Sequence, residues 1–354
     1  MHEASWSLNV GVGSRRGEKE PSAPLFVLPY LPMPKLRDII GHEAIRGELL
    51  TDLQSGNVSH AYLFAGSRHL GKMTLARWFA LQLITHGLPP TEAERSRHSF
   101  EHLMHPDLFV LDQLWIEDVC EDWDVIAQTS NAPQQHRSKK PAARTDAIGI
   151  DDIRALQERL GETSTAPFRC CIIRSVERMQ AEAANALLKI LEEPPASLVF
   201  LFTTQALTSL LPTVVSRMRV LRFHPLSHRE LHSLLEGVSE DDSQFILHLA
   251  QGAPGIIHEL KGDPEALRVH RLVHTKAISF WRARTLKERL KILEPLRERG
   301  DESDQLLLHL SLALREQAPA RREHVYGLHE LVAGLRTNAH RQLLSQRFAL
   351  SAGG

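Results

Sequence analysis

The sequence predicts an α/β protein in which a parallel β-sheet domain is followed by a small helical domain and then by a larger all-α domain. Up to about residue 224, short apolar runs of strand length alternate with longer amphipathic segments, which is the pattern of βα units around a parallel sheet. Beyond Pro225 the segments have only helical periodicity. The chain has 354 residues, which is too long for one compact domain and sufficient for two or three.

The expected elements of the sheet domain follow one another in a regular order. An amphipathic helix over 43–53 precedes a buried strand, a glycine-containing loop and a second helix, and Pro194-Pro195 ends a later helix. The expected strands are 61–65, 105–112, 169–174, 198–203 and 219–223. The expected helices are 43–53, 72–84, 151–161 and 180–192, then 227–236, 243–251 and several longer ones between residues 264 and 349.

These elements predict the domain boundaries. Residues 1–35 are rich in Gly, Pro, Ser and charge, and we expect a flexible leader there. The sheet domain covers 36–224 and includes a surface loop at 113–145, which is acidic first and then polar and basic. The small helical domain covers 225–262, and the larger helical domain covers 263–354.

The composition is that of a foldable chain with almost no net charge. Hydrophobic residues make up 42%, and 42 Lys and Arg residues face 43 Asp and Glu residues. Such a balance gives no large basic surface, so contacts with DNA would come from local basic faces or from partner subunits. The three cysteines, Cys120, Cys170 and Cys171, fit free thiols in a reducing compartment. The 20 histidines are scattered, and we expect surface or packing roles for most of them.

Membrane insertion is not expected. No apolar run approaches the ~20 residues that a spanning helix needs, and the nearest one, at residues 23–34, is interrupted by prolines and lacks a secretory cleavage site. The sequence therefore predicts a soluble, cytoplasmic protein.

A loop over 66–73 has the context of a phosphate-binding loop, because it follows an expected strand and opens an expected helix. Gly66 and Gly71 would let backbone N–H groups turn inward, and Lys72 would reach the phosphates. The next position should be Ser or Thr for Mg²⁺, but it is Met73, whose thioether is a poor ligand for this ion. Thr74 lies about 100° further around the helix and cannot simply replace it. Alternatively, the glycines only shape a turn and Lys72 is a solvated residue.

A second signature of nucleotide hydrolysis is missing. A buried strand ending in Asp-Glu should orient Mg²⁺ and polarise water, but the strand at 170–173 ends in Arg174-Ser175. Arg174 would repel the metal ion unless it points to solvent at the strand end, and Glu177 has the wrong spacing for the strand tip. Whether nucleotide binds without being hydrolysed stays open; ATP or ADP binding is doubtful, and no cofactor is expected.

Four stretches together resemble the AAA+ clamp-loader family. The run at 184–195, NALLKILEEPP within it, is long and specific. The four stretches are 40–43 with 59–66, 105–107, 179 with 184–195, and 211–217. The resemblance covers about residues 36–265 and implies an AAA+ domain, a helical lid and a helical collar that packs against neighbouring subunits; residues 335–339 support it more weakly. In the run at 184–195 the polar face would be a subunit- or DNA-facing surface, unless it is only solvated.

The resemblance assigns a role to Arg217, which follows Ser216 after a Leu-Pro-Thr turn. The equivalent arginine of clamp loaders projects into the ATP site of a neighbouring subunit, where a guanidinium stabilises the transferring phosphoryl group. Met218 replaces the cysteine of the family motif and leaves the arginine intact. Alternatively, Arg217 is a surface arginine or packs against a carboxylate. Thr204 matches a polar sensor on the fourth strand, or is only a strand-end threonine.

Two departures from the family limit the site further. The Gly-x-Pro-Gly turn at 252–255 is followed by Ile256 and Ile257 in place of the second-sensor arginine. Residues 86–104 contain no cysteine, so the zinc module of many relatives is not expected, and without thiolates His98, His102 and His105 do not predict a metal site.

The resulting prediction is a clamp-loader subunit without its own ATPase activity. It would belong to a bacterial replicative DNA polymerase holoenzyme, in a pentameric ring with gamma/tau-like ATPases and a delta-like subunit, and reach a sliding clamp and primer–template DNA through that ring. The alternative is an active, gamma/tau-like motor subunit, which is disfavoured by Met73, Arg174, Ser175 and Ile256 together. A stand-alone P-loop kinase would need the same missing residues.

Overall fold

The computed structural model describes residues 39–111, 147–160, 164–317 and 321–353. The predicted leader at 1–35 and the predicted surface loop at 113–145 lie outside the described residues.

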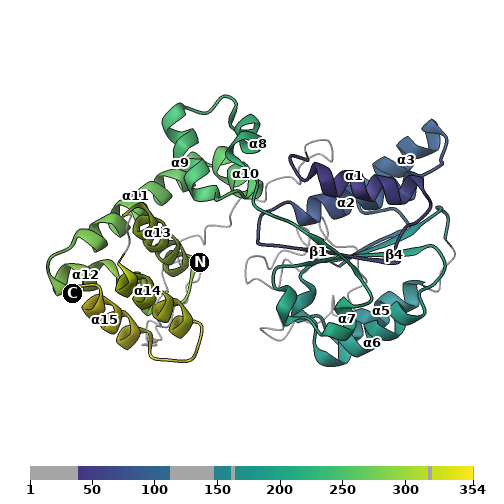
Figure 1. Ribbon diagram of the computed structural model, residues 1–354. Helices are drawn as coiled ribbons and strands as arrows, with labels where there is room; N and C mark the ends of the chain where they lie inside the picture. Colours follow the sequence, from purple (N-terminus) through teal and green to yellow (C-terminus); the bar gives the residue numbers. More distant parts are fainter. Residues whose placement is uncertain (1–38, 112–146, 161–163, 318–320, 354) are drawn as a thin grey trace, which may run out of the picture.

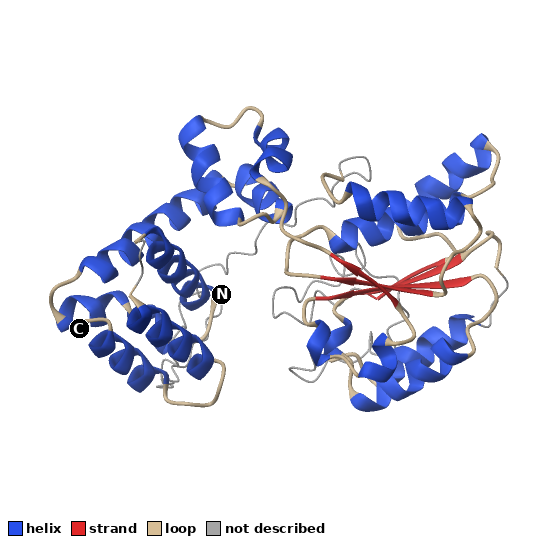
Figure 2. Ribbon diagram, viewed as in Figure 1, coloured by secondary structure: helices blue, strands red, loops and turns tan. Residues whose placement is uncertain are grey.

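Five parallel strands form one sheet, so the predicted α/β class is confirmed (Figures 1 and 2). Their order in the sheet is β2-β3-β4-β1-β5. The strands are β1 (Ala61–Ala65), β2 (Leu108–Leu111), β3 (Arg169–Ile173), β4 (Leu198–Thr204) and β5 (Arg219–Arg222). All five were expected within a few residues of these bounds, because each is a short apolar run bounded by turn residues.

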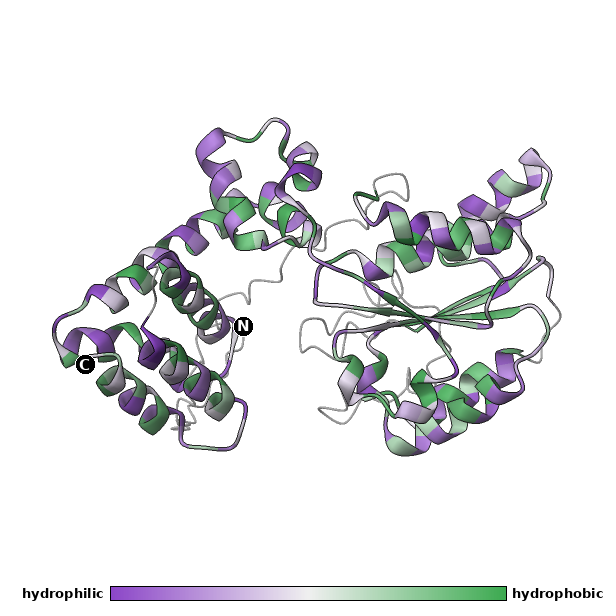
Figure 3. Ribbon diagram, in the orientation of Figure 1, coloured by the Kyte–Doolittle hydropathy of each residue, from purple (hydrophilic) through white to green (hydrophobic). Residues whose placement is uncertain are grey.

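Helices cover both faces of the sheet, and the strands are accordingly mostly apolar, although the edge strand β5 begins and ends with an arginine (Figure 3). One face packs against α1 (Glu43–Gln54), α2 (Lys72–Thr85) and α3 (Pro90–Glu101), and the other against α5 (Ile150–Leu160), α6 (Ala181–Glu192) and α7 (Pro212–Val215). Neighbouring residues of a strand face opposite sides, so Cys170 and Cys171 fall into different cores; both are buried free thiols.

One helix of this layer was not expected from the sequence. The polar helix α3 begins with Pro90 at its first position and contacts the core through one buried residue, Phe100. A single apolar contact leaves almost no periodicity to detect. The described residues of 86–104 thus form a packed helix where the relatives' zinc module was considered.

After Pro225, the described residues form helices and no strands. The lid contains α8 (His228–His232), the short 3₁₀ turn η4 (Ser233–Leu235), α9 (Glu240–Ala250) and α10 (Pro254–Gly262). The collar contains α11 (Pro264–Arg282), α12 (Leu286–Ile292), η5 (Glu294–Arg297), α13 (Asp301–Glu316), α14 (Arg322–Leu335) and α15 (Arg341–Ser351). A hydrophobic cluster of the collar joins Phe280, Leu310 and Phe348.

The lid is joined to the collar by side chains as well as by the chain itself. Leu312 of α13 belongs to the hydrophobic cluster of the lid. Arg271 of α11 donates to Asp241 at 2.6 Å and to Asp242 at 2.7 Å, both at the start of α9, and its guanidinium lies 4.6 Å from the ring centre of Phe245. Helix α9 is therefore fixed against α11 and α13 (Figure 1).

None of the described helices is both long enough and apolar enough to span a membrane.

Candidate functional site

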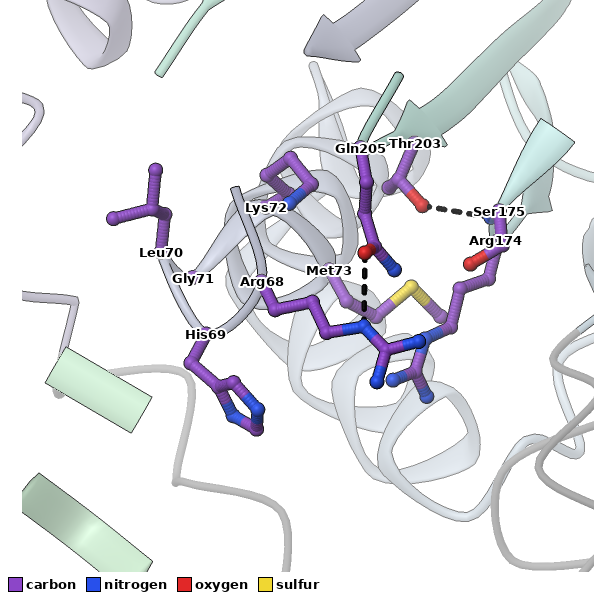
Figure 4. A pocket seen from close by; sticks show the side chains of 10 residues that line it. All are labelled: Arg68, His69, Leu70, Gly71, Lys72, Met73, Arg174, Ser175, Thr203 and Gln205. Atoms are coloured by element: carbon purple, nitrogen blue, oxygen red, sulfur yellow. Dashed lines mark hydrogen bonds between the residues drawn. The ribbon is translucent and has the colours of Figure 1, made fainter. Parts of the chain in front are cut away.

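The predicted phosphate loop connects β1 to α2 at the carboxyl ends of the parallel strands. Gly66 donates from its N–H to the carbonyl of Thr204 at the end of β4, 3.1 Å away. Gly71 has φ 84°, the left-handed conformation that glycine adopts without strain, and caps α2. The loop borders a cavity of about 170 Å³ (Figure 4). The lining residues are Arg68, His69, Leu70, Gly71, Lys72, Met73, Arg174, Ser175, Thr203 and Gln205.

Lys72 turns back onto its own loop. The side chain is buried, and Nζ donates to the carbonyls of Gly66 at 2.7 Å and Ser67 at 2.5 Å. Burial lowers the pKa of the Lys72 ammonium to about 8. The cation that would bind phosphate is therefore hydrogen-bonded within the chain and partly desolvated, and a ligand would have to displace these bonds.

Two further contacts hold the same loop from outside. His42, just before α1, lies with Nε2 3.0 Å from the carbonyl of Leu70. Gly255, in the first turn of lid helix α10, donates from its N–H to the carbonyl of His69 at 2.9 Å. A side chain at Gly255 would meet Cβ of His69 at 2.9 Å, so only glycine allows this approach. The lid and α1 thus fix the loop from both sides.

The described lining of the cavity lacks the carboxylates that would ligate Mg²⁺ in a metal–triphosphate complex. None of its ten described lining residues carries a carboxylate, whereas Arg68, Lys72 and Arg174 are cations. Met73 occupies the position of the Mg²⁺-binding hydroxyl and lines the cavity with a thioether. A volume of about 170 Å³ also lies below the several hundred Å³ typical of small-molecule pockets.

Polar side chains at the strand ends bond to one another. Ser175 donates from its N–H to Oγ1 of Thr203 at 3.1 Å, and Arg68 donates from Nε to Oε1 of Gln205 at 2.8 Å (Figure 4). Ser175 has φ 56°, so the backbone turns away immediately after Arg174. This end of the sheet carries no pair of Asp and Glu at the positions that hydrolysis requires.

Three residues considered from the sequence lie beside the cavity and do not line it. Thr74 is half-buried on α2, one position beyond Met73. Thr204 is fully buried, and its Oγ1 accepts from the N–H of Ala206 at 3.2 Å. Glu177 accepts from the N–H of Gln205 at 3.2 Å through Oε1. Its negative charge still opposes the lowering of the Lys72 pKa.

The lid presents apolar side chains at its second-sensor position. Ile257 is completely buried in the hydrophobic core of the lid. Ile256 packs against both the lid core and the core beside the phosphate loop. These side chains provide packing between lid and sheet domain, and no cation for a γ-phosphate.

Arg217 lies at the other end of the sheet. In the β1–β5 register Arg219, the first residue of β5, pairs with Tyr62, which lies four residues before Gly66. At about 3.3 Å per residue, the start of β5 is about 13 Å along the strands from the phosphate loop, and Arg217 precedes β5. The Arg217 side chain therefore cannot reach phosphates bound at its own chain's loop.

The guanidinium of Arg217 is oriented but accessible. Nη2 bonds to Oε1 of Glu192 at 2.7 Å, and Nη1 donates to the carbonyl of Thr213 at 2.8 Å. The Arg217 side chain remains 36% exposed and that of Glu192 51% exposed. Ser216 is the first residue after α7, and its hydroxyl donates to the same Thr213 carbonyl at 3.1 Å. Glu192 is the last residue of α6, so this pair connects the two most specific motifs.

The His105-Pro106-Asp107 motif has a structural role. Asp107 is fully buried and accepts from the N–H of Thr165 at 2.9 Å and of Ala166 at 2.8 Å. Burial acts to raise the pKa of the Asp107 carboxyl, but hydrogen bonds from the side chains of Thr165 and Ser164 and from these two N–H groups outweigh it, and the pKa is lowered. The carboxylate fixes the segment that leads into β3.

Sequence reasoning missed four participants in this region. Arg68, Thr203 and Gln205 line the cavity, and Glu192 holds Arg217. Arg68 was detectable as part of the loop, and Thr203 and Gln205 flank Thr204 on the opposite side of the strand. The Glu192–Arg217 pair joins residues that are distant in sequence and required the fold.

Comparisons with known proteins place these features in a family. Residues 41–227, more than half of the chain, match the family model described as DNA polymerase III, delta subunit. The DNA polymerase III subunit gamma/tau of Mycobacterium tuberculosis is 29% identical over 61% of this chain and 34% of its own length. The DNA polymerase III subunit delta' of Bacillus subtilis is 28% identical over 57% of this chain and 52% of its own length.

The matched region spans about a third to a half of these curated relatives. Among solved structures, a DNA polymerase III gamma subunit-related protein of Thermotoga maritima aligns with 86% of this chain and 98% of its own, at 18% identity and a TM-score of 0.46.

Proposed function

From the premise that the chain belongs to the family of the DNA polymerase III delta subunit, we propose that it is a delta-prime-like subunit of a bacterial clamp loader. In this role it hydrolyses no ATP itself and donates Arg217 to the ATP site of a neighbouring subunit. It acts in the cytoplasm in a pentameric ring that loads the sliding clamp on primed DNA. The observation that carries the proposal is that Arg217 and the phosphate loop lie at opposite ends of the sheet.

The residues around the phosphate loop support the proposal that this chain does not hydrolyse ATP. Mg²⁺ needs oxygen ligands, and the strand tip provides Arg174 and Ser175 instead of carboxylates. Lys72 is occupied by loop carbonyls. None of the described residues that line this cavity has a carboxylate that could orient an attacking water.

The Arg217 end supports a contribution to a partner. The guanidinium is exposed, oriented by Glu192, and at the opposite end of the sheet from its own loop. An arginine that completes another site must be accessible and preorganised. If a neighbour's triphosphate replaced Glu192 as the partner, the exchange would be between two anionic groups of similar geometry.

A gamma/tau-like motor subunit is the second candidate, because the gamma/tau relatives match this chain as well as the delta' relative does. It predicts ATP turnover by the purified chain, stimulated by primed DNA. Our proposal predicts that phosphate release by the chain alone stays at background with and without primed DNA. Turnover at the median enzyme rate of about 10 s⁻¹ would establish the motor candidate instead.

Arg217 is tested in the reconstituted loader. With Arg217→Ala, we expect single-turnover hydrolysis at the adjacent ATP site to fall by about 10³-fold or more. Arg222→Ala removes another exposed arginine, from the far end of β5, and serves as the matched control that should leave the rate unchanged. Equal rates for wild type and Arg217→Ala would refute the assignment while leaving the family membership untouched.

A further inference from the structure

Four histidines from three helices meet where the lid packs against the collar. His248 comes from α9, His270 and His274 come from α11, and His309 comes from α13. Glu316, the last residue of α13, borders the same cluster. These residues lie far apart in the sequence, and none takes part in the phosphate site or the Arg217 surface.

Three of these side chains converge as metal ligands do. Oε1 of Glu316 lies 2.9 Å from Nε2 of His248 and 3.2 Å from Nε2 of His274. All three ligand atoms lie within 4.8 Å of one another. Ligand atoms on a tetrahedral ion with bonds of about 2.0 Å are about 3.3 Å apart, so a small outward adjustment would admit an ion between them.

His248 lacks the hydrogen bond that a buried ring nitrogen normally makes. Its Nε2 is buried and, within the described part of the chain, has no hydrogen-bond partner. The 2.9 Å separation from Glu316 is an ion-pair distance without the alignment of a hydrogen bond. A nitrogen lone pair directed at a metal ion would remove this deficit.

The remaining histidines orient His274 from behind. Nδ1 of His274 lies 3.3 Å from Nδ1 of His309, and Nε2 of His309 lies 2.9 Å from Nδ1 of His270. His309 is fully buried. With a metal on Nε2 of His274, its Nδ1–H donates to His309, and Nε2–H of His309 donates to His270. Each contact then has one proton, and the ligand is held in one tautomer, as is usual for metal-binding histidines.

We propose that His248, His274 and Glu316 bind one divalent transition-metal ion of the Zn²⁺ class. Two imidazoles and one carboxylate are a ligand set that suits Zn²⁺, and the fourth position is left for water. Glu316 provides the negative charge, which is needed because Arg315, bonded to Gln251 at 2.6 Å, adds positive charge beside His248. The ion connects lid helix α9 to collar helices α11 and α13.

This site has a structural consequence for the lid. Its helix α10 contacts the phosphate loop through Gly255, while α9 would be fixed to the collar by the ion. The metal therefore limits rotation between lid and collar.

The test uses the full-length chain after treatment with a chelator, titrated with Zn²⁺ and, separately, with Co²⁺. We expect one ion per chain, the visible absorption of tetrahedral Co²⁺, and a rise in the melting temperature. Glu316→Gln is nearly isosteric at a 39% exposed side chain and should fold normally. We expect it, and His248→Ala, to weaken binding at least about 100-fold, since even removal of a residue behind a ligand costs 10–100-fold. His329→Ala, an exposed histidine of α14, is the matched control and should bind as wild type does.

Hydrogen exchange gives a second readout that does not depend on activity. Zn²⁺ should slow exchange in α9 of the wild type and have no such effect in Glu316→Gln. The proposal is wrong if the wild type binds no Zn²⁺ at micromolar concentration, or if both ligand variants bind it as tightly as the wild type. Either result leaves the Arg217 proposal standing, because that proposal uses no metal at this junction.

Discussion

At the carboxyl ends of the strands, the phosphate loop makes its hydrogen bonds with the rest of the same chain, whereas at the amino end of β5 Arg217 lies at the surface with one carboxylate partner. Lys72 is buried against Gly66 and Ser67. Arg217 is 36% exposed and paired with a half-exposed Glu192. The first cation is satisfied internally, and the second is available to another molecule.

Under the proposed function, one fold would lose a reaction and keep a contribution to it. Hydrolysis in the chain's own site needs several groups at once, and Met73, Arg174 and Ser175 stand where three of them would be. A contribution to a neighbour needs one oriented guanidinium, and a surface ion pair that costs little to exchange is sufficient to orient it.

The largest expected effect separates charge from geometry at the Arg217 end. Arg217→Lys keeps the positive charge but loses the planar guanidinium with its paired donors. We expect single-turnover hydrolysis at the adjacent site of the reconstituted loader to fall by about 10²-fold or more. If Arg217→Lys had the wild-type rate, a positive charge alone would be sufficient, and the planar guanidinium would not be required.

A second prediction concerns the phosphate end and tests whether its defects are local. In the triple variant Met73→Ser, Arg174→Asp and Ser175→Glu, a hydroxyl and two carboxylates replace the residues that exclude Mg²⁺. We expect the affinity for ATP to rise about 10–100-fold in the presence of Mg²⁺, measured by equilibrium titration, because ligands are supplied and a repulsive cation is removed.

The same titration without Mg²⁺ is the control and should show little gain, since the added carboxylates repel bare phosphates. If the wild type already binds Mg²⁺–ATP as tightly as the triple variant, the phosphate end is not defective in the way described.

A third prediction follows from the lowered pKa of Lys72. The pKa is about 8 in the folded chain and 10.5 when unperturbed, so between these values the unfolded state binds more protons. Stability contributed through Lys72 therefore rises as the pH rises from about 8 to 10.5. We expect the free energy of unfolding of the wild type, relative to Lys72→Met, to increase by about 1–3 kcal/mol over this window.

The difference in the free energy of unfolding between the two proteins is measured by urea unfolding at about pH 7.5 and about pH 10, near the limits of this window. Lys189→Met, on the solvated face of α6, serves as control because its ammonium is not buried in the same way. A pH-independent difference would show that Lys72 is not desolvated.

The smallest expected effect is at Glu192. Glu192→Gln removes the charge that orients Arg217, but a half-exposed pair contributes only about 0.2–1 kcal/mol. We expect the free energy of unfolding to change by less than about 1 kcal/mol and hydrolysis at the adjacent site to change by less than about tenfold. A loss as large as that of Arg217→Ala would make Glu192 a direct participant and not a positioning residue.

Much of the architecture was predictable from the sequence because its strands are short apolar runs and its phosphate loop has a local pattern. The strand at 61–65, the helix after Gly71 and the missing Asp-Glu pair after Ile173 can each be identified from a few consecutive residues. Helix α3 was not predicted, since its polar sequence is anchored by Phe100 alone.

The contacts that complete each site could not be predicted in the same way. Glu192 and Arg217, or His248 and Glu316, are brought together by the fold across long stretches of sequence. The histidines looked scattered along the chain, and the expectation of no metal site was based on the absence of cysteine motifs. Only the packing of α9 against α11 and α13 shows that four of them share one location.

The most direct test compares the two ends of the sheet in one assay, namely phosphate release by the reconstituted loader carrying either Lys72→Ala or Arg217→Ala in this subunit. The account predicts that the Lys72→Ala ring hydrolyses ATP at the wild-type rate, while the Arg217→Ala ring loses hydrolysis at the adjacent site. The opposite result, a ring impaired by Lys72→Ala and unaffected by Arg217→Ala, would show that this chain uses its own phosphate loop and would contradict the account.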